Sequence, residues 1–227
     1  MSKNKNLDSI DTAYLEELIT VSAETILIEM FGGNEYYAYR RGALPVLLVA
    51  HADTVFKAPP KPSQICKSET EWSAPDIGLG ADDRAGIYIA SKIIEQLDCS
   101  LVITNYEETG AAGAEHFAND CKDSYDFIIE FDRKNSNDAV FYDCYNKEFQ
   151  DAVLSQFYDH AIGSLSDISI IAPQLDIAAV NLSCGYYYAH SPDEILNLSE
   201  MQKAIVEGKK LIKRLLKTNK HFRYDNS

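Results

Sequence analysis

Apolar residues along the chain gather into segments that have the length and spacing of helices and strands. In residues 11–33 they recur at helical spacing behind Asp11, a residue type that caps helices well, and the segment ends at Gly32 and Gly33. Further helices are predicted over 84–97, 113–120, 147–161 and 199–217, the last of them amphipathic. Strands are predicted over 35–41, 44–51, 100–108, 126–132, 139–146 and 176–190.

The predicted strands carry continuous apolar runs, such as PVLLVA at 45–50, rather than alternating ones. Continuous runs are typical of parallel strands that are buried on both faces by helices. Because helices and strands alternate along the chain, we expect an α/β fold, a three-layer α/β/α sandwich around a mixed, mostly parallel sheet. The Pro-rich segment 57–63 reads as a surface loop, so one domain over residues 1–227 is the simpler prediction.

Composition excludes several classes of protein. A formal charge of −14 argues against a sequence-independent grip on nucleic acid, which needs a basic surface. No apolar run approaches the roughly 20 residues of a membrane span, and residues 1–10 lead into no signal-peptide core, so we expect a cytoplasmic protein. The five cysteines are scattered without a C-x-x-C pair, which favours free thiols over disulfides or a cysteine zinc site.

Histidines and acidic residues lie where the predicted strands end. In open α/β sheets, ligands bind beyond the carboxyl ends of the strands. The residues that gather there, or in the loop before the helix 84–97, are His51, Asp82, Asp83, Glu107, Glu108, Asp132 and His190. Two imidazoles and several carboxylates without cysteine suit zinc or another borderline divalent ion, and the oxygen donors suffice for two ions.

Each of these residues, taken singly, has a structural explanation. A histidine at a strand end can be a satisfied structural residue, and Asp82-Asp83 can cap the following helix. A pair of glutamates at a strand end is commonly solvated. The joint pattern, rather than any single residue, indicates a metal site.

Five motifs in this order, HADTV, GADDRAG, NYEETG, FD and YYYAHSPDE, resemble the co-catalytic di-zinc exopeptidases, among them leucyl-type aminopeptidases, peptidase T and the tetrahedral aminopeptidases. The motifs run from residue 51 to residue 194. The resemblance implies the zinc-exopeptidase fold and two zinc ions, with cobalt or manganese as alternatives. It implies one ion on His51, Asp82 and Asp132 and a second on Asp82, Glu108 and His190, with Asp83 as the less favoured bridge.

By the same resemblance, Glu107 is the general base, and Asp53 orients His51. Two residues apart on an extended segment, His51 and Asp53 point the same way, so that Asp53 could accept the imidazole N–H. Glu107 and Glu108, adjacent on a strand, are expected to diverge. The implied activity is aminopeptidase-type hydrolysis of a small peptide; an N-acyl amidohydrolase, a one-metal acyl transferase and a non-catalytic binding protein remain alternatives.

Other features leave their roles open. The chain has no room between Asp132 and His190 for the lid or dimerisation domain of many relatives, and the oligomeric state stays undetermined. Asp167 lies either near the pocket or in a plain loop, Arg133 either binds a substrate carboxylate or forms a structural ion pair, and Tyr186–Tyr188 either line the pocket or pack. The basic tail after Gly208 reads as the last helix of the sandwich rather than a membrane-binding segment. No role is assigned to His116, His160 or His221.

Overall fold

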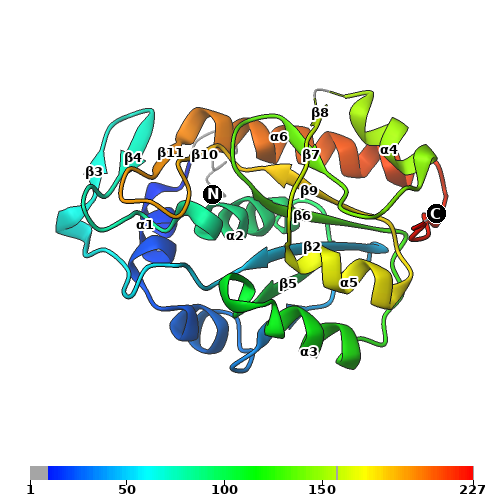
Figure 1. The fold of residues 1–227 in the computed structure, drawn as a ribbon, viewed down its shortest axis with the longest axis horizontal. Helices are drawn as coiled ribbons and strands as arrows, with labels where there is room; N and C mark the ends of the chain where they lie inside the picture. Colours follow the sequence, from blue (N-terminus) through cyan, green and yellow to red (C-terminus); the bar gives the residue numbers. More distant parts are fainter. Residues whose placement is uncertain (1–9, 157, 227) are drawn as a thin grey trace, which may run out of the picture.

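A seven-stranded mixed sheet forms the centre of the molecule (Figure 1), for which the computed structural model describes residues 10–156 and 158–226. In spatial order its strands are β1 (Tyr37–Arg40), β5 (Ser100–Thr104), β2 (Val46–His51), β6 (Phe127–Arg133), β9 (Ala179–Ser183), β7 (Asp138–Val140) and β8 (Asp159–His160). The strands β5, β2, β6 and β9 run parallel, whereas β1 and β7 pair antiparallel with β5 and β9. The prediction of a mixed, mostly parallel sheet is confirmed.

Helices cover both faces of this sheet (Figure 1), which confirms the three-layer sandwich. Alternate residues of β2 explain why: Leu48 packs on one face, while Leu47 and Val49 pack on the other. The face of Leu48 carries α1 (Thr12–Thr20), α2 (Ala81–Ile94), α4 (Lys147–Leu154) and α6 (Leu198–Leu216). The face of Leu47 carries α3 (Ala112–Asp120) and α5 (Asp167–Leu175).

A second, four-stranded antiparallel sheet lies beside the first, and the sequence pattern did not predict it. Its order is β10 (Tyr186–Tyr187), β11 (Ile195–Asn197), β4 (Glu71–Ser73) and β3 (Cys66–Lys67), with the short helix η2 (Pro62–Gln64) before it. The buried Trp72 pairs with Leu196 at its centre. This sheet joins the segment before Asp82 to the segment around His190.

Some predicted elements have other bounds. The helix expected over 11–33 is two pieces, α1 and the π-helix η1 (Thr25–Met30), because Val21 is extended and the Ser22 hydroxyl accepts the N–H of Thr25 in a new start. The helix expected over 147–161 ends at Leu154; residue 157 lies outside the described residues. The strand expected over 139–146 ends at Val140.

The helix α5 was not predicted, because Pro173 interrupts its sequence. Ser166 and Ser169 form a capping box at its start. Asp167 is therefore the first residue of a helix and not part of a loop, and its side chain is fully buried.

Residues that follow α6 close the amino end of the sheet. Phe222 donates its N–H to the carbonyl of Asp126 and accepts the N–H of Ala178, both at 2.8 Å, so it joins the beginnings of β6 and β9. Its ring is 2% exposed and lies 5.3 Å from that of Phe149. The amphipathic α6 packs on the sheet as predicted.

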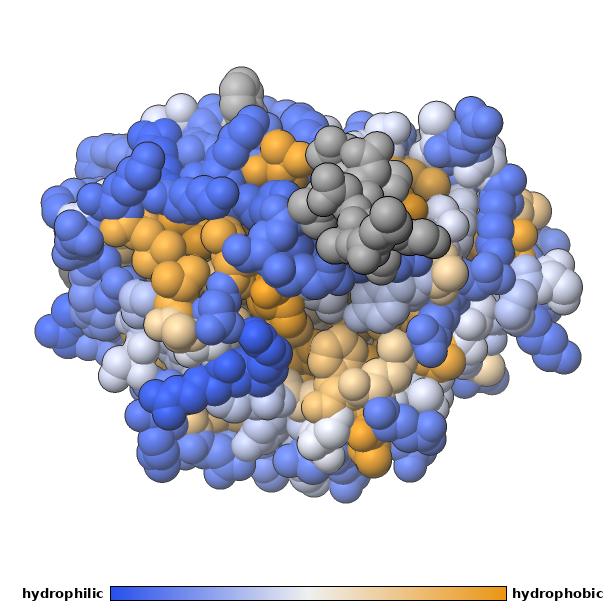
Figure 2. Space-filling model, turned by 180° about the vertical axis from the view of Figure 1, so that it is seen from behind, coloured by the Kyte–Doolittle hydropathy of each residue, from blue (hydrophilic) through white to orange (hydrophobic). Residues whose placement is uncertain are grey.

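The surface is mainly polar. Seen from behind, hydrophilic residues cover most of the molecule, and hydrophobic residues show in smaller areas between them (Figure 2). None of the helices within 10–156 and 158–226 is long and apolar enough to cross a membrane. All five cysteines are free thiols. One domain over residues 1–227 stays a prediction.

Candidate metal centre

His51 ends β2 at the carboxyl edge of the sheet and is 1% exposed. Its Nδ1 lies 3.0 Å from the backbone oxygen of Asp53 and 3.4 Å from the Asp53 carboxylate, so both groups of that residue can orient the ring. Its Nε2 points to the other side, 3.4 Å from an oxygen of Asp82 and 3.4 Å from one of Asp132. One ring nitrogen is therefore held in place while the other faces carboxylates.

Asp82 lies between the two histidines. Its Oδ1 is 3.4 Å from Nε2 of His51, and its Oδ2 is 3.1 Å from Nε2 of His190. Asp82 and Asp83 are joined by a cis peptide and have non-helical backbone angles at the start of α2. The two distances put one carboxylate within reach of both imidazoles, as expected of a bridging ligand.

Asp83 is turned toward the backbone instead. Its two oxygens accept the N–H groups of His51 and Gly86, at 3.2 and 3.0 Å. At Gly86 an added Cβ would lie 1.8 Å from the carbonyl oxygen of Phe131 and 2.3 Å from Asp83, so glycine lets the helix approach the sheet. Asp83 could still join a cation, since it groups with His51 and Asp132 within 4.8 Å, but its oxygens already have partners.

Glu107 and Glu108 do not lie on a strand. The strand expected over 100–108 ends at Thr104, and both glutamates lie in the 3-10 turn η3 (Glu107–Thr109) behind Tyr106, whose φ is +66°. The Asp53 carboxylate accepts the N–H groups of both glutamates, at 3.1 and 3.2 Å. Asp53 thus holds this turn as well as His51.

The two glutamate side chains reach different partners. Glu107 lies 3.9 Å from Nε2 of His51, and Glu108 lies 3.1 Å from Nε2 of His190. The two side chains thus contact different histidines, but one oxygen of each also lies with a ring nitrogen of His51 in a group of atoms within 4.8 Å of one another, so they do not diverge as widely as side chains on opposite faces of a strand.

Asp132 and His190 complete the cluster from two environments. Asp132 lies at a register shift in β6, its N–H donates to the side chain of Asn181, and its carboxylate accepts from Tyr186 and Ser166 at 3.3 Å. His190 follows β10 in a loop with φ +64°, and its side chain is 54% exposed.

The electrostatics of the cluster are dominated by its carboxylates. Burial raises the pKa of Glu107 to about 8 and that of Glu108 to about 7. A hydrogen bond to Asp82 raises the pKa of His190 to about 9. Burial alone would lower the pKa of His51, but the surrounding carboxylates, Asp132 foremost, raise it well above its usual range. The histidine protons therefore offset part of an excess of negative charge.

This donor set fits divalent cations. The described residues contain three groups of ligand atoms, and the atoms within each group lie within 4.8 Å of one another. One of these groups is formed by Asp82, Glu108 and His190. Glu108 Oε1 is buried without a hydrogen-bond partner. Among the described residues, neither lysine nor arginine pairs with Asp82, Glu108 or Asp132. Burying several carboxylates without a lysine or arginine to neutralise them is energetically unfavourable, so a bound cation would stabilise the cluster. Histidine and carboxylate side chains together are typical ligands of zinc and similar ions.

A hollow of about 280 Å³ opens beside the cluster. Asp82, Glu107, Asp132 and His190 line it, together with Tyr142 and Leu165. A substrate in this hollow would reach the cluster directly.

Glu194 is a functional candidate that the sequence reasoning quoted within a motif but gave no role. Its buried carboxylate accepts the N–H groups of Gly80, Ala81 and Asp82, at 2.5, 3.0 and 3.3 Å. Four residues after His190, it ties the loop of that histidine to the backbone of Asp82. Its place in YYYAHSPDE was the signal, but the contact spans more than 110 residues.

Glu130 was missed in the sequence, whereas Asp167 was named there with its role left open. Glu130 and Asp167 are fully buried, and they accept hydrogen bonds from Ser166 and Thr104 respectively. Burial raises the pKa of Asp167 to about 7. Glu130 lies in β6, the strand that also carries Asp132. Asp167 begins α5 and is bound through Thr104 to the end of β5, so both acidic residues are buried beside the strands that carry the cluster.

The remaining candidates have structural partners. Arg133 pairs with Asp138 at 3.2 Å, which supports the ion-pair interpretation. Tyr186 is buried against Asp132, Tyr187 donates to Glu200, and Tyr188 is 66% exposed. Aromatic contacts hold His116 and His160, and His221 lies 3.7 Å from Asp126, away from the cluster.

Comparisons with known proteins agree with this geometry. The sequence model described as peptidase family M28 matches residues 36–180. The search of curated proteins gave no match.

Several solved structures share the fold at low sequence identity. A tripeptidase from Staphylococcus aureus is 14% identical with a TM-score of 0.69, over 91% of this chain and 98% of that one. The aminopeptidase PepT from Bacillus cereus is 12% identical with a TM-score of 0.63, over 92% and 94%. The TET1 peptidase from Pyrococcus horikoshii, which can assemble into a tetrahedron or a large octahedral shell, is 14% identical with a TM-score of 0.58, over 93% and 99%.

Proposed function

The chain belongs to peptidase family M28, whose members are metal-dependent peptidases, and from this premise we propose that it is an aminopeptidase-type exopeptidase with two divalent ions. The observation that carries the proposal is the position of Asp82, whose two oxygens face the two histidines. A carboxylate shared in this way is what two neighbouring cations require. The similar structures, which include an aminopeptidase and a tripeptidase, support a small peptide as substrate.

The residues divide into two ligand sets. His51, Asp82 and Asp132 would hold one ion, and Asp82, Glu108 and His190 the other. Zinc fits these donors best, with cobalt and manganese as alternatives. When bound, the ions supply Lewis acidity, which lowers the pKa of a water molecule and polarises the scissile carbonyl.

The other residues position and move protons. Glu107 lines the hollow, with its carboxylate 3.9 Å from Nε2 of His51, so it can accept a proton from the attacking water and return it to the leaving amine. Asp53 fixes the position of Glu107 and Glu108 through their N–H groups and orients His51. Tyr186, whose hydroxyl contacts Asp132, keeps that carboxylate aimed at the cluster.

The test separates the general base from the metal ligands. In Glu107→Gln we expect metal content close to that of the parent, about two equivalents by plasma mass spectrometry, with turnover of an unblocked aminoacyl anilide reduced by roughly 10²- to 10⁴-fold. Glu115→Gln, an exposed substitution in α3, is the matched control. Full activity in Glu107→Gln would remove the general-base assignment.

A substrate panel separates the alternatives. Release from unblocked aminoacyl substrates supports the aminopeptidase. Cleavage of N-acyl substrates alone would move the proposal to an amidohydrolase that uses the same residues. Failure to retain zinc, cobalt or manganese would refute the proposed ligand sets.

A further inference from the structure

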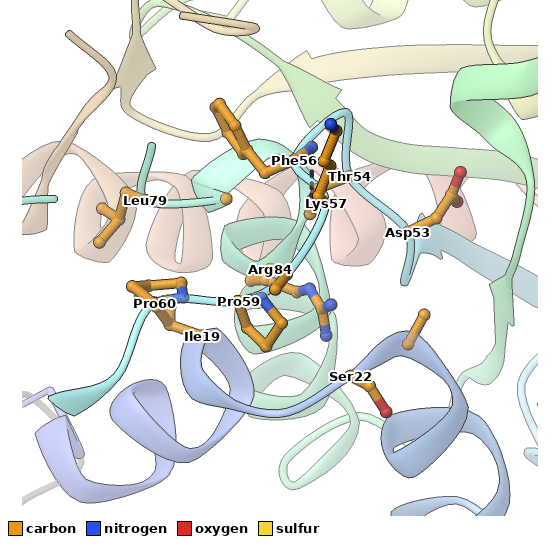
Figure 3. A pocket seen from close by; sticks show the side chains of 13 residues that line it. Ile19, Ser22, Asp53, Thr54, Phe56, Lys57, Pro59, Pro60, Leu79 and Arg84 are labelled. Carbon is orange, nitrogen blue, oxygen red and sulfur yellow. Dashed lines mark hydrogen bonds between the residues drawn. The ribbon is translucent and has the colours of Figure 1, made fainter. Parts of the chain in front are cut away.

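A second hollow, of about 200 Å³, lies between the end of α1, the loop after Asp53 and the start of α2 (Figure 3). Its walls are largely apolar, and the only buried cation among its lining residues is Arg84. We call it the Arg84 pocket, lined chiefly by Ile19, Phe56, Pro59, Pro60, Leu79 and Arg84. Asp53 lies at its border, and none of the proposed metal ligands lines it.

Arg84 is buried with hydrogen-bonding capacity to spare. Its side chain reaches from α2 toward the gap between Pro59 and Ser22 (Figure 3), and the residue is 4% exposed. Nη1 makes one long hydrogen bond to the carbonyl of Leu18, at 3.3 Å, and Nε is buried without a partner. In the described part of the chain, no carboxylate lies within ion-pair distance of Arg84, and the nearby Asp53 and Asp83 accept hydrogen bonds from backbone N–H groups instead.

The guanidinium stays charged in this setting. Burial lowers its pKa to about 10, while the nearby charges of Asp53 and Asp83 act in the opposite sense. A charged guanidinium that is buried with unused donors is unfavourable, and a planar anion that accepts from those donors would stabilise it.

The surroundings select the kind of anion. Both oxygens of Asp53 already accept N–H groups of the η3 turn, so Asp53 does not neutralise Arg84 directly, but its charge disfavours a doubly charged ligand. A carboxylate matches the fork of the guanidinium with a single charge. The walls formed by Ile19, Phe56 and Leu79 suit an apolar body attached to it.

We propose that the Arg84 pocket is a binding site for a small monocarboxylate with an apolar body. The carboxylate pairs with Arg84, and the hydrocarbon part packs against the loop of Pro59 and Pro60. The site is separate from the metal ligands and does not depend on peptidase activity.

A titration with pentanoate tests the site on the purified full chain with its bound metal. Using ¹⁵N-labelled protein, we expect saturable shifts of the Arg84 Nε–H signal and of the amides of residues 54–60, with a dissociation constant in the millimolar range typical of so small a ligand. Pentanamide, which has the same body without the charge, is the matched ligand control. It should bind at least tenfold more weakly.

Three variants locate the binding. Arg84→Gln should bring the affinity for pentanoate down to that for pentanamide. Because Arg84 is buried and its replacement can unfold the chain, Ala23→Phe, which fills the half-buried rim of the pocket, is the second variant and should weaken pentanoate binding at least tenfold. His190→Ala, on the metal cluster, should leave the pentanoate affinity unchanged.

Three results would overturn the proposal. Equal affinity for pentanoate and pentanamide would mean an apolar pocket without a carboxylate site. Shifts centred on residues 107, 108 and 190 that vanish in His190→Ala would place the carboxylate on the metal centre. Absence of saturable shifts would mean that the pocket binds neither.

Discussion

The two halves of the candidate metal centre are built in contrasting ways. His51 and Asp132 stand at the ends of adjacent parallel strands, and both side chains are less than a tenth exposed. Glu108 and His190 stand on a 3-10 turn and on a loop, and the His190 side chain is more than half exposed. The sheet itself fixes the first half, whereas contacts between distant loops fix the second. We therefore expect the first half to hold its ion more tightly and the second half to exchange its ion more readily.

Asp82→Ala should produce the largest effect, because it removes the residue that both halves share. We expect metal content to fall in both halves and turnover to fall by about 10³-fold or more, since each ion contributes several kcal/mol to the reaction. Plasma mass spectrometry with a turnover assay measures this. Glu69→Ala, at an exposed position before the motif, serves as control. A loss of only one equivalent would show that the halves do not share this carboxylate.

Replacing each histidine compares the halves directly. His190→Ala should remove about one metal equivalent and destabilise the metal-free chain less than His51→Ala does, because the His190 side chain is 54% exposed and water screens its pairing with Asp82 and Glu108. His51→Ala should destabilise the metal-free chain by about 1–3 kcal/mol, because it leaves buried carboxylates without their partner. Urea unfolding measures both. Equal losses of stability would contradict the difference between the halves.

Asp53→Asn should act on both halves but more mildly. An amide retains one acceptor oxygen, so the turn of Glu107 and Glu108 keeps one of its two hydrogen bonds to this side chain. We expect metal affinity or turnover to fall by roughly 10- to 100-fold. Competition with a chelator gives the affinity. If the affinity falls only for the more weakly held ion, then Asp53 positions the turn of Glu107 and Glu108 and does not orient His51.

Glu194→Gln should have the smallest effect and sharpen the account of the second half. The amide loses charge on a group that accepts three backbone N–H groups, so we expect about 1–2 kcal/mol less stability and a metal affinity lower by a few-fold. Asp193→Asn, exposed and adjacent in sequence, is the control. An unchanged unfolding midpoint would mean that Glu194 does not stabilise the loop around Asp82.

The contrast between the halves also explains what the sequence could reveal. The ends of β2 and β6 follow from continuous apolar runs, so the positions of His51 and Asp132 could be predicted from local pattern alone. The positions of Glu107 and Glu108 do not follow from where a strand ends, because both lie in a turn that is held by hydrogen bonds to Asp53, more than 50 residues away in the sequence. For the loop of His190 and for the ligand sets themselves, the prediction rested on the family resemblance.

Elements stabilised by distant contacts were the ones missed. The strands of the small sheet have two or three residues each, too few for a periodic pattern, and Trp72 meets Leu196 across more than 120 positions. The helix α5 carries an internal proline that hides its pattern. The pairing of Glu194 with residues 80–82 depends on the same kind of long-range contact.

The return of Phe222 to the sheet has a consequence for how the protein is made. The amino ends of β6 and β9 stay uncovered until residue 222 has been synthesised, because its backbone pairs with Asp126 and Ala178. At typical translation rates of about 5–20 residues per second, the stretch from Asp126 to Phe222 takes on the order of 5–20 s. During that interval the apolar ring of Phe127 lacks its contact with the ring of Phe222, so this end of the core is completed only near the end of synthesis.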